Sequence, residues 1–152
     1  MSQENVDVVL RMFEAFNQRD RITLEALWRS DAVIDWSRAR GPLKGVYRGV
    51  DERRTFYDEF WSLFQSDHIE TYDVEEAGDD VVVPNTAHMR GRDGIEVTAR
   101  STFVFTVEHG LITRLRMFQE RPRPPKLPGC GSRRFSSRLA DVPMVGPTSA
   151  DR

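Results

Sequence analysis

The stretch from Glu96 to Arg121, EVTARSTFVFTVEHGLITRLRMFQER, decides the fold of this chain. In its first half, apolar or small residues occupy every second position from Val97 to Val107, with mostly polar residues between them. Such alternation predicts a β-strand with one face turned inward. A second run begins at Leu111, after the sequence EHG at 108–110. The stretch therefore predicts an antiparallel hairpin.

The length of the connecting loop decides how the two strands pair. A three-residue loop with its glycine in the left-handed conformation pairs Phe103 with Leu115 and Ser101 with Met117. A two-residue loop would pair Val104 with Leu115 and mix the two faces, so the first register is favoured. The predicted inner face consists of Ala99, Ser101, Phe103, Leu115, Met117 and Gln119. This face can line either a core or a pocket.

Three helices are predicted before the hairpin. Ser2 can cap the first helix, Asp20 offers a cap for a short second helix, and Asp51 opens the third. The first helix has an apolar stripe at helical spacing, formed by Val6, Val9, Leu10, Phe13 and Phe16. The third helix is expected to turn inward the side chains of Phe56, Phe60, Leu63 and Phe64.

Short strands are predicted at residues 31–36, 69–76 and 81–90, and residues 37–47 read as a loop. Pro84 lies inside the last of these strands. Because proline cannot donate a ladder hydrogen bond, we expect a bulge or a distortion there.

Composition describes a chain of 152 residues with a net charge of −2, which fits a single domain with its own core. That charge gives no bias toward nucleic acid or an anionic membrane. No signal peptide or membrane-spanning segment is apparent, so a cytoplasmic location is the default expectation. The single cysteine, Cys130, excludes an intrachain disulfide. His68, His88 and His109 lack metal-ligand spacing, so neither a metal nor another cofactor is expected.

The character of the chain changes at residue 122. Residues 122–152 contain six of the eight prolines and carry six basic and two acidic residues. We therefore divide the chain into a domain at 1–121 and an extended or disordered tail at 122–152. The tail is either a solvated segment without a specific role, a basic arm for a partner, or a terminus altered by a shifted reading frame.

Four segments carry a resemblance to a known family: VVLRMFEAFN at 8–17 followed by Asp20, SDAV at 30–33, YRG at 47–49 and HGLITRLRMF at 109–118. Over about residues 3–121 the chain resembles the nuclear transport factor 2-like superfamily, in its SnoaL-like, ketosteroid isomerase-related and polyketide cyclase-like branch. The resemblance implies a cone-shaped α+β domain in which three N-terminal helices pack on a curved, mostly antiparallel sheet around a pocket. It also implies a homodimer. Because this fold hosts enzymes, binding modules and adaptors, it does not by itself define a function.

The catalytic positions of two related enzyme groups can be carried over. The two oxyanion-hole donors of ketosteroid isomerase fall on Met12 and at or next to Ser101, and its base falls on Asp35 or Trp36. Without the two donors nothing here would stabilise an enolate, which argues against steroid isomerisation.

The catalytic arginine and two aspartates of limonene-epoxide hydrolases fall on Thr86, His88 and Met117. An imidazole and a thioether thus replace the two carboxylates that would hold a water molecule. This argues against epoxide hydrolysis by that mechanism.

Two titratable residues are the catalytic candidates. His88 can act as a general base through water if it faces the pocket, or it can be a half-buried histidine bonded to a neighbouring strand. Asp35 can be an acid or a base raised by apolar neighbours, or it can face away and pair with Arg38 or Arg40.

The leading prediction is a pocket for a small, largely apolar molecule, with metal-free acid–base chemistry of the isomerase, cyclase, hydratase or hydrolase type through His88 and Asp35. The residues expected to contact the ligand are Phe16, Trp36, Thr86, Ser101, Phe103, Leu115 and Met117. One alternative is a non-catalytic ligand-binding or dimeric interaction domain. Another is a protein–protein module that uses the outer face of the hairpin, formed by Thr98, Arg100, Thr102, Val104, Arg116 and Phe118.

Overall fold

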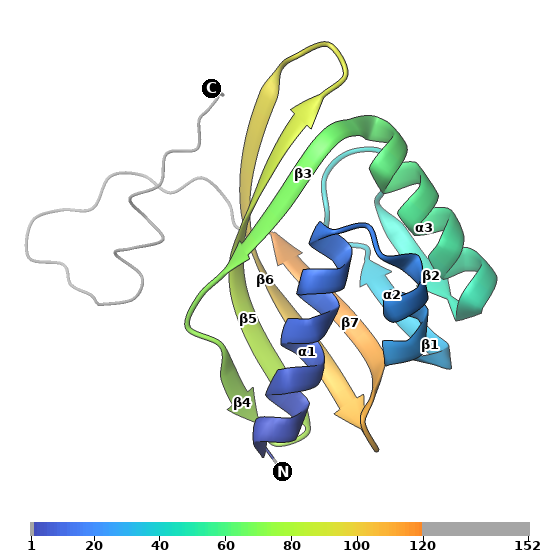
Figure 1. Cartoon of the computed structure of the whole chain (residues 1–152), viewed down its shortest axis with the longest axis vertical. Helices are drawn as coiled ribbons and strands as arrows, with labels where there is room; N and C mark the ends of the chain where they lie inside the picture. The colour runs from blue at the N-terminus through green and yellow to red at the C-terminus, as the bar shows by residue number, and fades with distance from the viewer. Residues whose placement is uncertain (1, 120–152) are drawn as a thin grey trace, which may run out of the picture.

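Helices and strands follow one another along residues 2–119, the part of the chain that the computed structural model describes (Figure 1). The proposed tail at 122–152 lies outside the described residues. The elements are α1 (Ser2–Asn17), α2 (Arg21–Leu27), β1 (Trp28–Trp36), β2 (Gly45–Arg48), α3 (Gly49–Leu63), β3 (Phe64–Thr71), β4 (Glu75–Ala77), β5 (Asp80–Gly91), β6 (Glu96–Glu108) and β7 (Leu111–Gln119).

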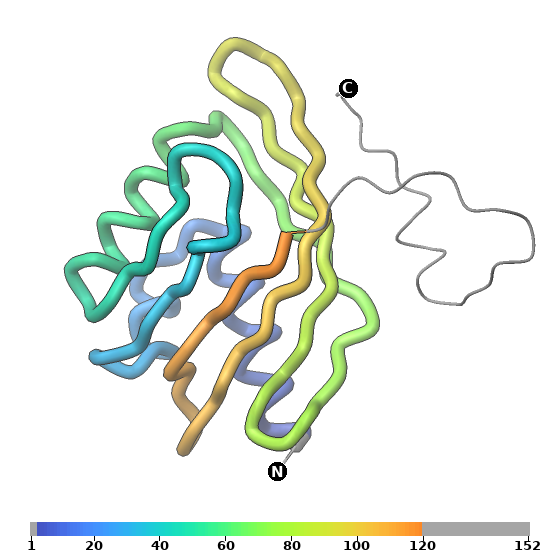
Figure 2. The backbone as a smooth tube through the Cα atoms, turned by 180° about the vertical axis from the view of Figure 1, so that it is seen from behind, coloured from blue at the N-terminus to red at the C-terminus, as the bar shows by residue number. Residues whose placement is uncertain are grey.

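All seven strands belong to one sheet, in the order β2-β1-β7-β6-β5-β3, with β4 beside β5. Only β1 and β7 pair in parallel, and the other pairs are antiparallel. The helices lie on one face of the sheet (Figure 1), and the view from behind shows the opposite face without a helix from the described residues (Figure 2). The predicted α+β fold, three N-terminal helices on a curved and mostly antiparallel sheet, is confirmed.

Helix α1 buries one side against the sheet. Val9, Phe13 and Phe16 are buried as predicted, and Met12 joins them. Leu10, however, is 39% exposed, so its predicted place in the stripe is wrong. It lies one residue past Val9, roughly 100° around the helix, which turns it away from the sheet.

The other two helices differ slightly from their predicted bounds. The predicted cap of α2 is present, because the Asp20 carboxylate accepts a hydrogen bond from the Thr23 backbone N–H at 3.1 Å. Helix α3 begins at Gly49, earlier than Asp51, and ends at Leu63, which is 40% exposed and therefore only partly turned inward.

The hairpin of β6 and β7 turns through two residues. His109 and Gly110 both have positive φ angles, 54° and 78°, which defines a type I′ turn. The three-residue loop was therefore the wrong prediction. The observed pairing of β6 with β7 is shifted by two residues from the predicted register, so that Phe103 lies opposite Met117 and Ser101 lies opposite Gln119.

The residues predicted for the inner face nevertheless lie on that face. The pairing shifts between Thr106 and Val107, which leaves Thr113 as an extra residue in β7. With the two-residue turn alone, the β7 residues predicted for the inner face would lie on the outer face of the sheet. The extra residue of the bulge returns them to the inner face. Because the net slip is an even number of residues, every side chain keeps its face.

Pro84 causes no irregularity between β5 and β6, contrary to our expectation, since the pairing runs without a shift from Asp80 to Arg90. The Pro84 carbonyl accepts a hydrogen bond from the Tyr72 N–H at 3.2 Å, so its backbone faces the other neighbour of β5. On that side β3 has ended at Thr71 and β4 has not yet begun. The missing N–H of proline therefore falls in a gap of the ladder.

Candidate ligand-binding cavity

A cavity of about 250 Å³ lies between the helices and the sheet. Its walls come from α1, α3, the connection between β1 and β2, and strands β1, β3, β5, β6 and β7. Nine aromatic side chains line it: Phe13, Phe16, Trp28, Trp36, Phe56, Tyr57, Phe60, Phe64 and Phe103. Their ring contacts fix the wall, as in the edge-to-face pairs of Trp36 with Phe56 and with Phe103, whose centroids are 4.9 and 5.4 Å apart.

The cavity opens at one end of the molecule. Four of its lining side chains are exposed, namely Arg40, Pro42, Leu63 and Val97. They come from the β1–β2 connection, the end of α3 and the start of β6, which meet at the end of the molecule that carries the β5–β6 hairpin (Figure 1). We call these four residues the mouth.

Arg40 is the only charged residue among those that line the cavity. Its backbone N–H donates to Oε1 of Gln119, another lining residue, at 3.0 Å. Within residues 2–119, its guanidinium forms no ion pair with a carboxylate. A cation without an acidic partner therefore stands at the mouth of an otherwise uncharged cavity.

The floor of the cavity is formed by alternate residues of β5, β6 and β7. Ser101 donates from its hydroxyl to Oδ1 of Asn85 at 3.1 Å, and the Asn85 amide donates to the Val83 carbonyl at 3.0 Å. Both side chains are buried. These bonds hold a small polar spot in a mostly apolar floor.

A second polar group lies in the wall between α3 and β1. Tyr57 is 3% exposed, and its hydroxyl oxygen is itself buried. Burial raises the pKa of the Tyr57 phenol well above its ordinary value, against smaller lowering effects of Arg53, Arg21 and a hydrogen bond with Trp28. The hydroxyl is therefore neutral and keeps its proton over the physiological range.

Arg53 lies behind this wall and is only 1% exposed. Its guanidinium stands over the Trp28 ring, 5.3 Å from the centroid, and donates to Oε1 of Glu25 at 3.2 Å. The positive charge of Arg53 acts to lower the pKa of Tyr57, against the larger effect of burial.

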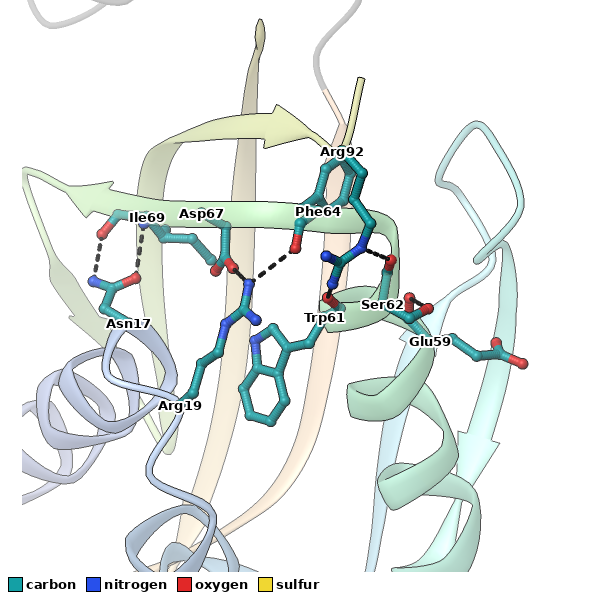
Figure 3. Close-up of polar contacts among 9 residues, drawn as sticks. All are labelled: Asn17, Arg19, Glu59, Trp61, Ser62, Phe64, Asp67, Ile69 and Arg92. Atoms are coloured by element: carbon teal, nitrogen blue, oxygen red, sulfur yellow. Dashed lines mark hydrogen bonds and ion pairs between the residues drawn. The ribbon is translucent and has the colours of Figure 1, made fainter. Parts of the chain in front are cut away.

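A polar network fixes the side of the cavity where α1, α3 and β3 meet (Figure 3). The Asn17 amide donates to the Ile69 carbonyl at 3.0 Å and accepts from the Ile69 N–H at 2.8 Å. Arg19 reaches the Phe64 carbonyl at 3.2 Å and the buried carboxylate of Asp67 at 2.5 Å. Because Ile69 and Phe64 line the cavity, these bonds hold one of its walls in place.

Arg92, in the β5–β6 turn, caps the end of α3. It donates to the Ser62 carbonyl at 2.9 Å and to the Trp61 carbonyl at 3.5 Å (Figure 3). These are among the last carbonyls of the helix, which have no partner within it. The contact ties the hairpin tip to the last turn of α3, which also carries Leu63 of the mouth.

Six of the seven residues expected to contact a ligand do line the cavity: Phe16, Trp36, Ser101, Phe103, Leu115 and Met117. Thr86 does not. Its hydroxyl is bonded to that of Tyr72, and the cavity is lined by its neighbours Asn85 and Ala87. The expected place of Thr86 in the pocket is therefore wrong, because β5 presents its odd-numbered residues to the cavity.

His88 lies two residues after Thr86, on the same face of β5, and is also absent from the cavity wall. Its side chain is 48% exposed, and its Nε2 lies 3.2 Å from Oε1 of Glu70 on β3. The expectation that His88 faces the pocket is therefore wrong. The alternative interpretation, a histidine bonded to a neighbouring strand, describes its position.

Asp35 also lies outside the cavity wall. Its carboxylate accepts hydrogen bonds from the Ser37 hydroxyl at 2.6 Å and the Ser37 N–H at 3.0 Å, and lies 3.8 Å from Arg38. The hydrogen bond from the Ser37 hydroxyl lowers the pKa of Asp35, with contributions from the backbone and Arg38. The structure thus places Asp35 on the face away from Ile34 and Trp36, with a lowered rather than a raised pKa.

Sequence reasoning missed Asn85, Tyr57 and Arg40 as lining residues. A signal for Asn85 was present, since Val81 and Val83 are apolar and alternate with it along β5. Tyr57 was placed beside the inward face of its helix. Nothing in the local sequence distinguishes Arg40 from the other arginines of its loop.

Within residues 2–119, no group of three histidine, cysteine, aspartate or glutamate side chains has the proximity needed to hold a metal ion. None of the helices in this part of the chain is long and apolar enough to cross a membrane.

The described residues have an α+β fold of the nuclear transport factor 2-like type, with an apolar cavity between its helices and its sheet. Residues 9–115 match the model of the SnoaL-like domain, and the chain belongs to this family. The resemblance stated from the sequence is thereby confirmed. A search of the curated proteins found no match.

Solved structures show the same fold at low sequence identity. TerC, co-crystallised with polyporic acid, is 19% identical and superposes with a TM-score of 0.69 over 77% of this chain and 92% of its own. A nuclear transport factor 2-like protein of unknown function from Burkholderia pseudomallei is 24% identical, with a TM-score of 0.69 over 79% and 92%. A ketosteroid isomerase-like protein from Catenulispora acidiphila, in complex with trimethylamine, is 12% identical, with a TM-score of 0.65 over 73% and 83%.

Proposed function

We propose that this protein binds a small, largely apolar molecule in the cavity. The observation that carries the proposal is an aromatic-lined cavity of about 250 Å³ with one opening and a few fixed polar groups. Ligand sites are typically concave, mostly apolar and between about 300 and 1,000 Å³. A volume just below that range favours a compact ligand of one or two fused rings.

The titratable groups of the wall favour binding over acid–base catalysis. Among the residues that line the cavity, Arg40 is the only charged one, and burial raises the pKa of the Tyr57 phenol. A general base works best with a pKa near the operating pH, and a phenol with a raised pKa does not meet that condition. Because His88 and Asp35 lie outside the wall, we assign neither of them a part in binding.

Two of the similar structures support a small-molecule ligand. TerC was crystallised with polyporic acid, and the Catenulispora acidiphila protein with trimethylamine. Both compounds are small organic molecules. Shape rather than a shared motif would select between ligands, since these proteins are less than 25% identical to this chain.

The test uses 2-isopropenylnaphthalene, an apolar probe of two fused rings, and isothermal titration calorimetry on the full-length protein. We expect saturable binding at one site. Ala99→Phe places a ring in the cavity and should abolish binding, because Ala99 lines the floor. Thr98→Phe adds the same bulk to the other face of β6 and should leave binding intact. Absence of binding to the wild type, or equal binding to Ala99→Phe, would contradict the proposal.

We also retain the homodimer as a proposal. The face of the sheet opposite the helices carries half-buried Val104, Arg116 and Phe118, and no helix of the described residues covers it (Figure 2). Light scattering should give twice the chain mass, and a strict monomer at high concentration would remove the idea. A cytoplasmic location remains an expectation from composition.

A further inference from the structure

A row of polar side chains crosses the floor of the cavity from one strand to the next. Asn85 of β5 pairs with Ser101 of β6, and Ser101 pairs with Gln119 of β7. All three line the cavity, and Gln119 is bonded to the backbone of Arg40 at the mouth. Because directly paired residues of neighbouring strands have Cβ atoms about 4.5–5.5 Å apart, one small ligand group can reach two members of the row.

The proton of the Ser101 hydroxyl has a fixed direction. The Val83 carbonyl can only accept, so the amide nitrogen of Asn85 faces it at 3.0 Å, which leaves Oδ1 to face Oγ of Ser101 at 3.1 Å. An amide oxygen also only accepts, so the Ser101 hydroxyl donates its single proton to Asn85. No residue within 2–119 donates a hydrogen bond to Oγ of Ser101. This oxygen is therefore an acceptor that awaits a donor.

The side-chain amide of Gln119 is oriented by the same reasoning. The Arg40 backbone N–H can only donate, so Oε1 of Gln119 faces it at 3.0 Å. Among the described residues, the amide nitrogen of Gln119 has no acceptor. Gln119 therefore presents a donor next to the acceptor of Ser101.

A ligand in the cavity can contact both side chains. Ser101 is 8% exposed and lies on the face of β6 that lines the cavity. Gln119 is half-buried and lies beside the mouth. By contrast, the Tyr57 hydroxyl oxygen and Nε1 of Trp28 are buried behind the wall. The row is thus where polar side-chain groups of the floor meet a ligand.

We propose that the cavity recognises a ligand group that carries a hydrogen-bond donor and an acceptor side by side, with the donor on Oγ of Ser101 and the acceptor on the amide N–H of Gln119. This inference rests on the proposed function, since it requires a ligand in the cavity. A lone carbonyl would satisfy Gln119 but would leave Ser101 without a donor. The ligand class is thereby narrowed to compact ring compounds with a carboxamide, lactam or hydroxyketone group.

The test compares three probes of nearly the same shape, 2-naphthamide, 2-acetylnaphthalene and 2-isopropenylnaphthalene. The first carries a donor and an acceptor, the second an acceptor alone, and the third neither. Calorimetry on the full-length protein should show affinities that fall in this order, each step by about 2- to 10-fold, the size of one neutral hydrogen bond. A cavity that offers the probe no hydrogen bonds would give the reverse order, because the amide would lose its hydrogen bonds to water.

Two variants separate the two contacts. Ser101→Ala removes the acceptor and should abolish only the preference for 2-naphthamide over 2-acetylnaphthalene. Gln119→Glu keeps an oxygen for the Arg40 N–H but replaces the donating nitrogen, and should abolish only the preference for 2-acetylnaphthalene over 2-isopropenylnaphthalene. Thr102→Val, which removes a hydroxyl that does not line the cavity, is the matched control and should keep both preferences.

The order of the three affinities in the wild type decides the question if a variant does not fold. Equal affinities, the reverse order, or preferences that persist unchanged in folded Ser101→Ala and Gln119→Glu would overturn the inference and leave the apolar cavity standing. Failure of all three probes to bind would overturn the proposed function as well.

Discussion

At the scale of single residues, the cavity combines an apolar lining with very few charges. Arg40 is its only charged lining residue and stands at the mouth, where solvent reaches it. A cation in this position can attract a ligand with an acidic group at its outer end. Such an attraction would be modest and sensitive to salt, because the site is exposed.

We expect Arg40→Gln to weaken the binding of 2-naphthoate about 2- to 5-fold at low salt, an effect of the size found for exposed charge pairs. The affinity for uncharged 2-acetylnaphthalene should change little. Arg38→Gln is the matched control, because Arg38 lies two residues away in the same loop, stacks on Phe118 and does not line the cavity. Calorimetry at two salt concentrations measures the effect, and equal losses in both variants would contradict the assignment.

Most of the floor could be predicted from residues alone, and most of the chemistry could not. All six residues that the alternation along β6 and β7 predicted for the inner face do line the cavity, because period two follows from the pleat of a strand. Thr86 and His88 were misplaced by one residue, and in a strand one residue reverses the face. Arg40 and Tyr57 became visible only in three dimensions, since their roles depend on the opening and on neighbours distant in sequence.

At the scale of elements, three local devices stabilise the fold: the β6–β7 turn, the hydrogen bonds of Asn17 around Ile69 and the cap of α2. The turn places His109 in a left-handed conformation, which residues other than glycine adopt infrequently.

His109→Asn should therefore stabilise the protein by up to about 1 kcal/mol, because Asn-Gly is the preferred pair of a type I′ turn. His109→Val should destabilise it, since a β-branched residue tolerates positive φ poorly. Urea unfolding measures both changes. A lower stability for His109→Asn would indicate that the turn is not of this type.

Asn17→Ala removes both hydrogen bonds that bracket Ile69 and leaves its N–H and carbonyl without those partners. We expect a loss of about 2 kcal/mol in the free energy of unfolding, together with weaker probe binding, because Ile69 lines the cavity. Gln18→Ala, an exposed neighbour, is the control and should change stability little. Equal stabilities of the two variants would show that the bracket contributes nothing.

The cap of α2 predicts a dependence on pH. Hydrogen bonds from Thr23 lower the pKa of Asp20 below its ordinary value of 3.8. A group with a lowered pKa in the folded state stabilises the fold above its ordinary pKa and loses this contribution as the pH falls through the lowered value.

Asp20→Asn keeps a capping oxygen but removes the charge. The wild type should therefore exceed the variant in stability at pH 7, and the difference should shrink below pH 3.8. Urea unfolding at several pH values tests this, and a difference that does not change with pH would refute it.

The order of the elements was readable from the sequence, but their exact registers were not. Caps and apolar spacing predicted all three helices in order. The two-residue turn and the bulge at Thr113 compensate each other, and only their sum affects the pattern of faces. Local patterns therefore predicted the faces correctly and the pairing incorrectly.

At the scale of the whole molecule, the fold and its family follow from the sequence, whereas the size and shape of the cavity do not. A SnoaL-like domain of three helices on a curved sheet leaves room between its layers. Whether side chains fill that room depends on their rotamers and on contacts between distant elements, such as α3 and β1. The central claim is therefore that the space between the helices and the sheet stays open and binds a small molecule.

Methionine methyl NMR tests this claim most directly. Three of the five methionines, Met12, Met89 and Met117, line the cavity on α1, β5 and β7, and Met→Leu variants assign their signals. In the full-length protein labelled with 13C at the methionine methyl groups, 2-acetylnaphthalene should shift all three signals with one common affinity, because its rings would lie among them. Absence of a shift at all three signals, at probe concentrations that saturate the calorimetric signal, would place the probe elsewhere and contradict the account.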